Sequence, residues 1–196
     1  MDSLINSSPS GSADITLDAK HHIRVPPSLS KHLRPYQREG VKFFFERYNL
    51  GRGAILGDDM GLGKTLQVIS FLSALMRKSG TLSDKERRRN RVSQLQDSEG
   101  WLENRKLPPP DDKWPTALII APSSVVNVWT REFDKVIVLV YPRVHHGTDI
   151  TKWGYFEVGV YIGTPSERER VLNDFTLGRL DIGVSYFSSS PHGSSI

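Results

Sequence analysis

The sequence predicts an α/β fold with a mostly parallel sheet and flanking helices. Two observations support this class. A short apolar run at 53–56 leads through a glycine-rich loop into a run with helical spacing, and a second apolar run at 116–122 is followed by another helical pattern. Alternating strands and helices are typical of parallel strands with crossover helices. A length of 196 residues with 37% hydrophobic content favours one domain.

The elements before the loop follow a polar leader. Residues 1–14 are rich in Ser, Gly and Asn, so we expect them to be disordered, and residues 15–27 to be extended. Apolar side chains recur at helical spacing from Val41 to Tyr48, which predicts a helix. Pro35 suits its first turn, because a proline there forfeits no helical hydrogen bond.

The glycine-rich loop at 57–65 reads Gly-Asp-Asp-Met-Gly-Leu-Gly-Lys-Thr. The run at 53–56 predicts a buried strand before it, and the pattern at 65–76 predicts a helix after it. Gly61 and Gly63 carry no side chain, so backbone N–H groups can meet phosphate oxygens at the positive helix end. Lys64 would reach the terminal phosphates, and the Thr65 hydroxyl would ligate Mg²⁺.

This pattern predicts ATP with Mg²⁺ as the ligand. It departs from the strict phosphate-loop motif at one position, because Asp58 stands five residues before Gly63, where a glycine is expected. The alternative is a helix-entry turn that binds no ligand. The flanking strand and helix favour the phosphate-binding interpretation.

Residues 77–114 lack periodicity and predict an exposed loop with a basic cluster at 87–91. Such a cluster contacts nucleic acid, acts as a nuclear address or is simply solvated, and the last is the commonest case. The continuous apolar run at 116–122 predicts a strand buried on both faces, followed by a helix over 127–133. Further strands are predicted at 158–162 and 180–184. A helix between them should begin at Ser166, a suitable N-cap, and end at Gly178.

Composition limits the kinds of site and partner. The formal charge of +4 and the pI near 9.4 favour an anionic partner such as nucleic acid. The absence of cysteine excludes disulfides, thiolate metal sites and cysteine nucleophiles. No segment approaches the length of a membrane span, and the first residues do not resemble a secretory signal, so we expect no membrane partner.

Three segments, at 33–41, 57–65 and 121–133, together closely resemble the start of a Swi/Snf-type DNA-dependent ATPase of helicase superfamily two. The sequence at 55–65, with Asp59 where most members carry glutamate, is most similar to that of the Cockayne-syndrome-B-related DNA-repair branch. The resemblance implies a RecA-like lobe that binds ATP and Mg²⁺, in which Gln37 reads adenine because an amide both donates and accepts. The implied nucleotide-binding residues are Gln37, Asp58, Asp59, Met60, Gly61, Leu62, Gly63, Lys64 and Thr65.

The resemblance also implies contacts with the backbone of double-stranded DNA. Residues 122–129 correspond to a DNA-contacting family motif, which assigns this role to Pro122, Ser123, Ser124 and Trp129. Backbone contacts need hydroxyls, N–H groups and cations, so no sequence specificity is expected. The alternative is an ordinary strand-to-helix turn with Trp129 in the core. Residues 181–187 resemble the start of another DNA motif, from which 185–188 depart.

Two features of the family have no counterpart in this sequence. These are the acidic Asp-Glu-Ala-His-type box that holds Mg²⁺ and positions water, and the second lobe with its arginines. We therefore expect a truncated lobe over 15–187, with an irregular tail over 188–196, that binds ATP without appreciable turnover. In a complete parent, turnover would drive translocation on DNA in the nucleus, for chromatin remodelling or repair with partner proteins. The alternatives are an inactive regulatory fragment that binds nucleotide or DNA, and a chain that does not fold.

Residues 136–152 interrupt the family pattern. The part at 136–141 is a charge-free, β-prone run, which is an aggregation hazard if exposed. One hypothesis is a retained intron or gene-model error. The other is a true extra strand or an insertion of the subgroup.

Overall fold

The computed structural model describes residues 15–97, 114–134, 136–138, 150–152 and 154–187. The predicted leader at 1–14 and tail at 188–196 lie outside these ranges. The described elements in chain order are β1 (Ile15–Asp18), β2 (Ile23–Val25), α1 (Pro27–Ser30), α2 (Pro35–Asn49), α3 (Lys64–Leu75), α4 (Ser83–Gln96), β3 (Ala117–Pro122), α6 (Ser123–Asp134), β4 (Val136–Val138), β5 (Ile150–Lys152), β6 (Val158–Val160), α7 (Pro165–Thr176) and β7 (Ile182–Phe187).

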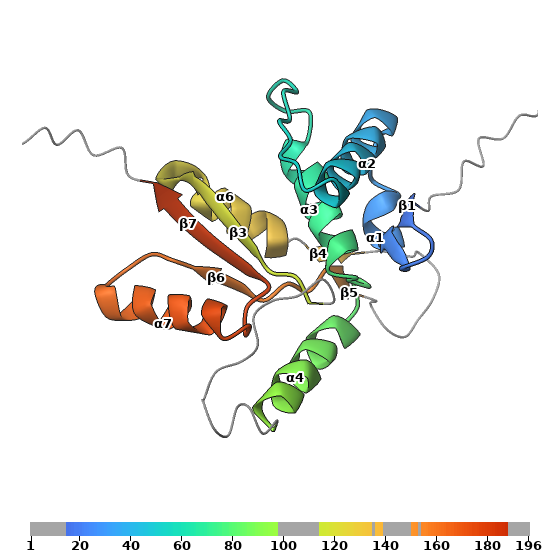
Figure 1. Ribbon diagram of the computed structural model, residues 1–196. Helices are drawn as coiled ribbons and strands as arrows, with labels where there is room; N and C mark the ends of the chain where they lie inside the picture. The colour runs from blue at the N-terminus through green and yellow to red at the C-terminus, as the bar shows by residue number, and fades with distance from the viewer. Residues whose placement is uncertain (1–14, 98–113, 135, 139–149, 153, 188–196) are drawn as a thin grey trace, which may run out of the picture.

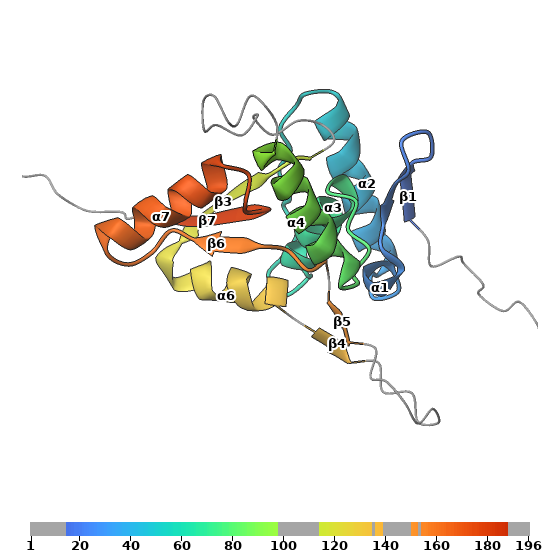
Figure 2. The ribbon, with the colours of Figure 1, turned by 90° about the horizontal axis from the view of Figure 1, so that it is seen from below.

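A three-stranded parallel sheet in the order β3-β7-β6 lies at the centre of the fold. β3 pairs with β7 along its whole length, from Ala117 opposite Ile182 to Pro122 opposite Phe187. α6 and α7 cover opposite faces of this sheet (Figures 1 and 2). The predicted α/β class, with a parallel sheet and flanking helices, is thereby confirmed.

β3 is buried on one face only, so the expectation of burial on both faces is wrong. Leu118 and Ile120 are 58% and 62% exposed, whereas Ala121 faces the core. β3 is an edge strand of the sheet, and α7 packs mainly over β6 and β7. One face of β3 is therefore left uncovered.

Residues 53–56 do not form the predicted strand, and Ile55 is 90% exposed. A strand is stable where a neighbouring strand satisfies its N–H and C=O groups. None of the described strands pairs with this segment. The apolar run is therefore insufficient to make a strand without a ladder partner.

The helical half of the core is formed by α2 and α3 with the β1–β2 hairpin. Pro35 occupies the first turn of α2, as predicted, and Val41 and Ile69 are fully buried in this half. α3 also contacts α6, which buries Val126 and Phe133 beneath the sheet. A single apolar cluster therefore connects the helices to the sheet.

The N-cap of α7 is Thr164 and not the predicted Ser166. The Thr164 hydroxyl accepts a hydrogen bond from the Glu167 N–H, and the Glu167 carboxylate accepts one from the Thr164 N–H. This reciprocal capping box, with Pro165 at the first helical position, starts the helix earlier. Gly178, in the left-handed region, follows the helix end as predicted. Within the described ranges, no helix has the length and apolarity to cross a membrane.

Part of the predicted loop at 77–114 is the helix α4. Asp84, in its first turn, holds the preceding segment, because its carboxylate accepts hydrogen bonds from the N–H groups of Ser79 and Gly80. Arg88 of the basic cluster is buried and paired with Asp181. The expectation of a solvated cluster is therefore wrong for Arg88, because a buried carboxylate elsewhere in the chain neutralises it. Residues 98–113 lie outside the described ranges.

The interrupting region at 136–152 contributes a pair of short strands. β4 and β5 pair antiparallel, with Val136 opposite Lys152 and Val138 opposite Ile150. This agrees with the alternative of an extra strand. Residues 139–149 between the two strands lie outside the described residues.

Asp181 lies at the centre of a buried ion cluster. Its carboxylate accepts hydrogen bonds from Lys78 Nζ at 2.7 Å, from Arg88 and from the Glu157 N–H at 2.9 Å. Burial alone would raise the pKa of Asp181, but the charges of Lys78 and Arg88 outweigh burial and hold that pKa below its usual value. The carboxylate therefore stays ionised in the core.

We predict that Asp181→Asn lowers the free energy of unfolding by about 3–5 kcal/mol, because it leaves two buried cations without their partner. Since the folded-state pKa of Asp181 is depressed, its contribution is complete above the unfolded pKa of about 4 and is lost as the pH falls through the folded value. Urea unfolding at pH 7 and across pH 2–5 measures both effects.

The matched control is Asp174→Asn, which breaks the partly exposed pair with Arg179 and should cost about 1 kcal/mol or less. Equal losses in the two variants would show that the Asp181 cluster does not stabilise the fold.

Candidate nucleotide-binding site

The loop between α2 and α3 projects at the top of the molecule in Figure 1. Gly61 and Gly63 have φ angles of +86° and +79°, which strain any residue with a side chain. Gly61 has open space on the side where a Cβ would stand. The backbone of the loop is therefore open to an incoming ligand at this point.

The amino end of α3 is left without a side-chain cap. Gly63 is its N-cap residue, no side chain caps the helix, and its first turn contains no acidic residue. The first N–H groups of a helix have no partner within it, and the helix dipole makes this end positive. The end of α3 therefore has the character of an anion site.

Lys64 folds back onto the loop that precedes it. Its Nζ donates to the carbonyl oxygens of Asp58 and Asp59 at 2.6 and 2.7 Å. An ammonium group has three donors, so one remains for an anion. Lys64 thus closes the loop and keeps one donor free at the amino end of α3.

Gln37 is buried and holds the loop against α2. Its Oε1 accepts a hydrogen bond from the Arg34 N–H at 2.9 Å, and its Nε2 donates to the Leu62 carbonyl at 2.9 Å. The Tyr36 hydroxyl donates to the same carbonyl at 3.2 Å. A Cβ on Gly63 would overlap Gln37 Nε2, so only glycine allows this approach. The implied adenine contact of Gln37 stays a prediction.

The predicted nucleotide-binding residues are brought together around the end of α3. Asp59, Met60 and Leu62 are exposed, Asp58 is half-buried, and Thr65 is half-buried in the first turn of the helix. No group of three or more His, Cys, Asp or Glu side chains suited to a metal ion occurs among the described residues. Thr65 remains the predicted contact to Mg²⁺.

Sequence reasoning missed Gln67, a fully buried residue of α3. Its Nε2 donates to the Asp58 carboxylate at 2.9 Å. The available signal was a polar residue on the apolar face of a helix that opens directly from the loop. The structure thus adds a side chain behind the loop to those predicted in it.

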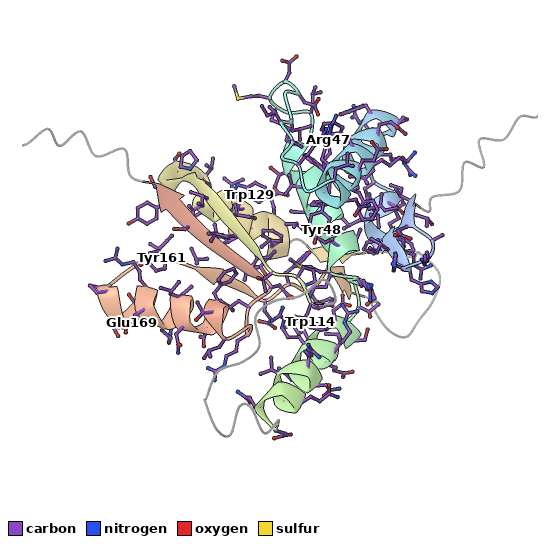
Figure 3. All side chains as sticks on the ribbon, in the orientation of Figure 1. Arg47, Tyr48, Trp114, Trp129, Tyr161 and Glu169 are labelled. Carbon is purple, nitrogen blue, oxygen red and sulfur yellow. The ribbon has the colours of Figure 1, made fainter. Side chains whose placement is uncertain are left out.

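The predicted DNA contacts divide into two groups. Pro122, Ser123 and Ser124 are exposed where β3 ends and α6 begins. Trp129 is half-buried on α6 (Figure 3). Its ring stacks on that of Phe133, with the ring centroids 6.0 Å apart. Trp129 therefore packs at the edge of the core, in agreement with the alternative interpretation for this residue.

Comparison with known proteins finds a matching family and several proteins of similar sequence. A model of the SNF2-related domain matches residues 36–167. The chain is 40% identical over 145 residues to mouse "DNA excision repair protein ERCC-6-like 2", covering 74% of this chain and 8% of that protein. It is 39% identical over 127 residues to Arabidopsis thaliana "Switch 2", covering 65% and 12%. It is 37% identical over 119 residues to human "DNA repair and recombination protein RAD54-like", covering 58% and 12%.

Among solved structures, the "Sulfolobus solfataricus SWI2/SNF2 ATPase core in complex with dsDNA" matches 79% of this chain and 21% of that chain, with 25% identity and a TM-score of 0.42. The chain spans only 8 to 12% of the length of the three curated relatives. The family match itself runs from the start of α2, through the glycine-rich loop, into α7. Because it covers 132 of the 196 residues, the chain belongs to the SNF2 family of helicase superfamily two.

Proposed function

We propose that this chain binds ATP with Mg²⁺ as the nucleotide-binding part of a SNF2-type, ATP-dependent motor that acts on duplex DNA. The geometry of the loop at 57–65 supports the proposal most strongly. Two left-handed glycines, an uncapped helix end and the Lys64 ammonium converge at one place. A phosphate chain supplies the negative charge and the acceptors that this arrangement lacks.

The residues of the loop would act on the phosphates and on Mg²⁺. The N–H groups at the amino end of α3 would hold the phosphate oxygens, and the third donor of Lys64 Nζ would reach a terminal phosphate. The Thr65 hydroxyl would hold Mg²⁺, which supplies charge neutralisation when bound. Gln37 still has one N–H and one lone pair free after its two hydrogen bonds, and these would meet adenine.

The exposed start of α6 would contact the DNA backbone. Ser123 and Ser124 offer hydroxyls beside the N–H groups of the first helical turn, and Pro122 leads the chain to this edge. Trp129 would support this turn from the side of the core by its stacking on Phe133. Because the relatives are DNA-repair proteins by name, we propose that this chain acts in the nucleus, with chromatin or repair proteins as partners.

Hydrolysis of ATP requires residues beyond those that bind it. The 196 residues contain no acidic box of the Asp-Glu-Ala-His type, whose carboxylates position Mg²⁺ and the attacking water. We therefore propose that this chain binds nucleotide without turning it over. A regulatory role, in which the chain competes for nucleotide or DNA, is the alternative.

We predict that Lys64→Ala weakens ATP binding at least about tenfold, or by about 1.4 kcal/mol, because a charge-assisted phosphate contact is lost. Isothermal titration measures the Kd, and the rise in melting temperature with ATP measures the same linkage. Lys42→Ala, which removes an exposed lysine paired with Glu39 on α2, is the control and should bind like wild type. Equal binding by both variants would refute the assignment of the loop.

We predict no DNA-stimulated phosphate release by this chain above the buffer background. A coupled phosphate assay with saturating ATP, Mg²⁺ and duplex DNA tests this. Robust release that disappears in Lys64→Ala would overturn the proposal of binding without turnover.

We predict that the double variant Ser123→Asp, Ser124→Asp weakens duplex DNA binding severalfold, because two carboxylates repel the phosphates. The loss should be equal on unrelated DNA sequences, since backbone contacts do not specify bases. Fluorescence anisotropy with two unrelated duplexes, at 50 and 200 mM salt, measures the loss of affinity and its independence of sequence. Ser166→Asp, in the first turn of α7, is the matched control and should leave binding unchanged. Equal affinities of the double variant and the control would remove α6 from the DNA surface.

A further inference from the structure

Gln67 is a polar residue in an apolar environment. It lies on α3 among fully buried positions that include Ile69 and Ser70, and its own side chain is fully buried. Its Nε2 donates to the Asp58 carboxylate at 2.9 Å. This hydrogen bond joins the body of the helix to the loop that leads into it.

The orientation of the Gln67 amide follows from its partner. A carboxylate only accepts hydrogen bonds, so Nε2 must face Asp58 and Oε1 must face the opposite way. Oε1 points at Gly40 of α2, where a Cβ would overlap it, and it has no hydrogen-bond partner. A buried acceptor without a partner costs stability. The chain therefore keeps one unfavourable group in its core together with the hydrogen bond to Asp58.

Asp58 is held from two sides. Its carbonyl oxygen accepts from Lys64 Nζ at 2.6 Å, and its carboxylate accepts from Gln67. Asp58 is half-buried, so water could solvate the carboxylate if Gln67 were absent. The Asp58 carboxylate therefore does not need Gln67 to compensate its charge. The main effect of the hydrogen bond is to restrict the position of the loop.

We propose that Gln67 is a positioning residue for the phosphate-binding loop, which it fixes through Asp58 at the expense of fold stability. The proposal rests on the nucleotide site described above for its effect on affinity. Its effect on the loop itself does not depend on any ligand. It also accounts for Asp58 in place of the glycine of the strict motif, because a glycine has no side-chain acceptor for Gln67.

The test is Gln67→Met, which keeps the length and volume but removes both the donor and the unpaired acceptor. We expect the melting temperature of the ligand-free chain to stay the same or rise. The ¹⁵N order parameters of the loop amides between Gly57 and Gly63 should fall, by about 0.2 on a scale where rigid backbone is about 0.85. The Kd for ATP should rise about tenfold, near the lower end of what is expected for one hydrogen bond to a charged group.

Ser70→Ala is the matched control, since Ser70 is also fully buried on α3 and its hydroxyl has no partner. It should leave the loop order parameters and the Kd unchanged. Asp58→Asn keeps an acceptor for Gln67 and should retain most of the affinity that Asp58→Ala loses. In an Asp58→Ala background, Gln67→Met should have no further effect on the Kd, because the two residues act as a unit.

Unchanged loop order parameters in Gln67→Met would overturn the proposal, as would a lower melting temperature with an unaltered loop, which marks a purely structural role. A Kd effect of Gln67→Met that persists in full in the Asp58→Ala background would also overturn it. If wild type fails to bind ATP, the proposed function fails. The ligand-free order parameters still decide whether Gln67 positions the loop.

Discussion

The structure depends first on Asp181, where four separate parts of the chain meet. Its carboxylate joins Lys78, just beyond α3, to Arg88 on α4. Its backbone joins the strands, because its carbonyl accepts from the Ala117 N–H and its N–H donates to the Glu157 carbonyl. Each cation is itself buried, so the cluster is stable only while all three charges are present. The start of the sheet and the carboxyl end of α3 are thereby fixed to each other.

α3 connects this cluster to the candidate site at its other end. The helix spans 12 residues, or about 18 Å. One end leads to Lys78 and the ion cluster, and the other opens from the loop that contains Gly61 and Gly63. The loop is held by Gln37 from α2, by Gln67 from α3 and by Lys64 from its own end. The apolar core fixes the helices, and three polar side chains then fix the loop on them.

Periodicity and capping chemistry predicted most of the elements, because these signals are local. The helical spacing of α2 and α3, the stop at Gly178 and the apolar runs of β3, β6 and β7 all correspond to elements of the fold. The N-cap of α7 was misplaced by two residues within a local motif, whereas two larger errors fall where a partner distant in sequence decides the outcome. Residues 53–56 lack a ladder partner among the described strands, and Arg88 is buried because Asp181, 93 residues away, pairs with it. The local sequence pattern indicates neither the missing ladder partner of 53–56 nor the ion pair of Arg88 with Asp181.

By itself, the sequence determined the fold class, the family and the position of the glycine-rich loop, because these depend on residue types at fixed spacing. It also determined which residues have the chemistry for a nucleotide, Gln37 and those at 58–65, since hydroxyls, amides and an ammonium are properties of the side chains. Only the tertiary structure decided how these groups are used. Gln37 fastens the loop, Gln67 reaches Asp58 from behind it, and Trp129 packs on Phe133. Such roles depend on which helices meet in space, and three-dimensional packing alone sets that.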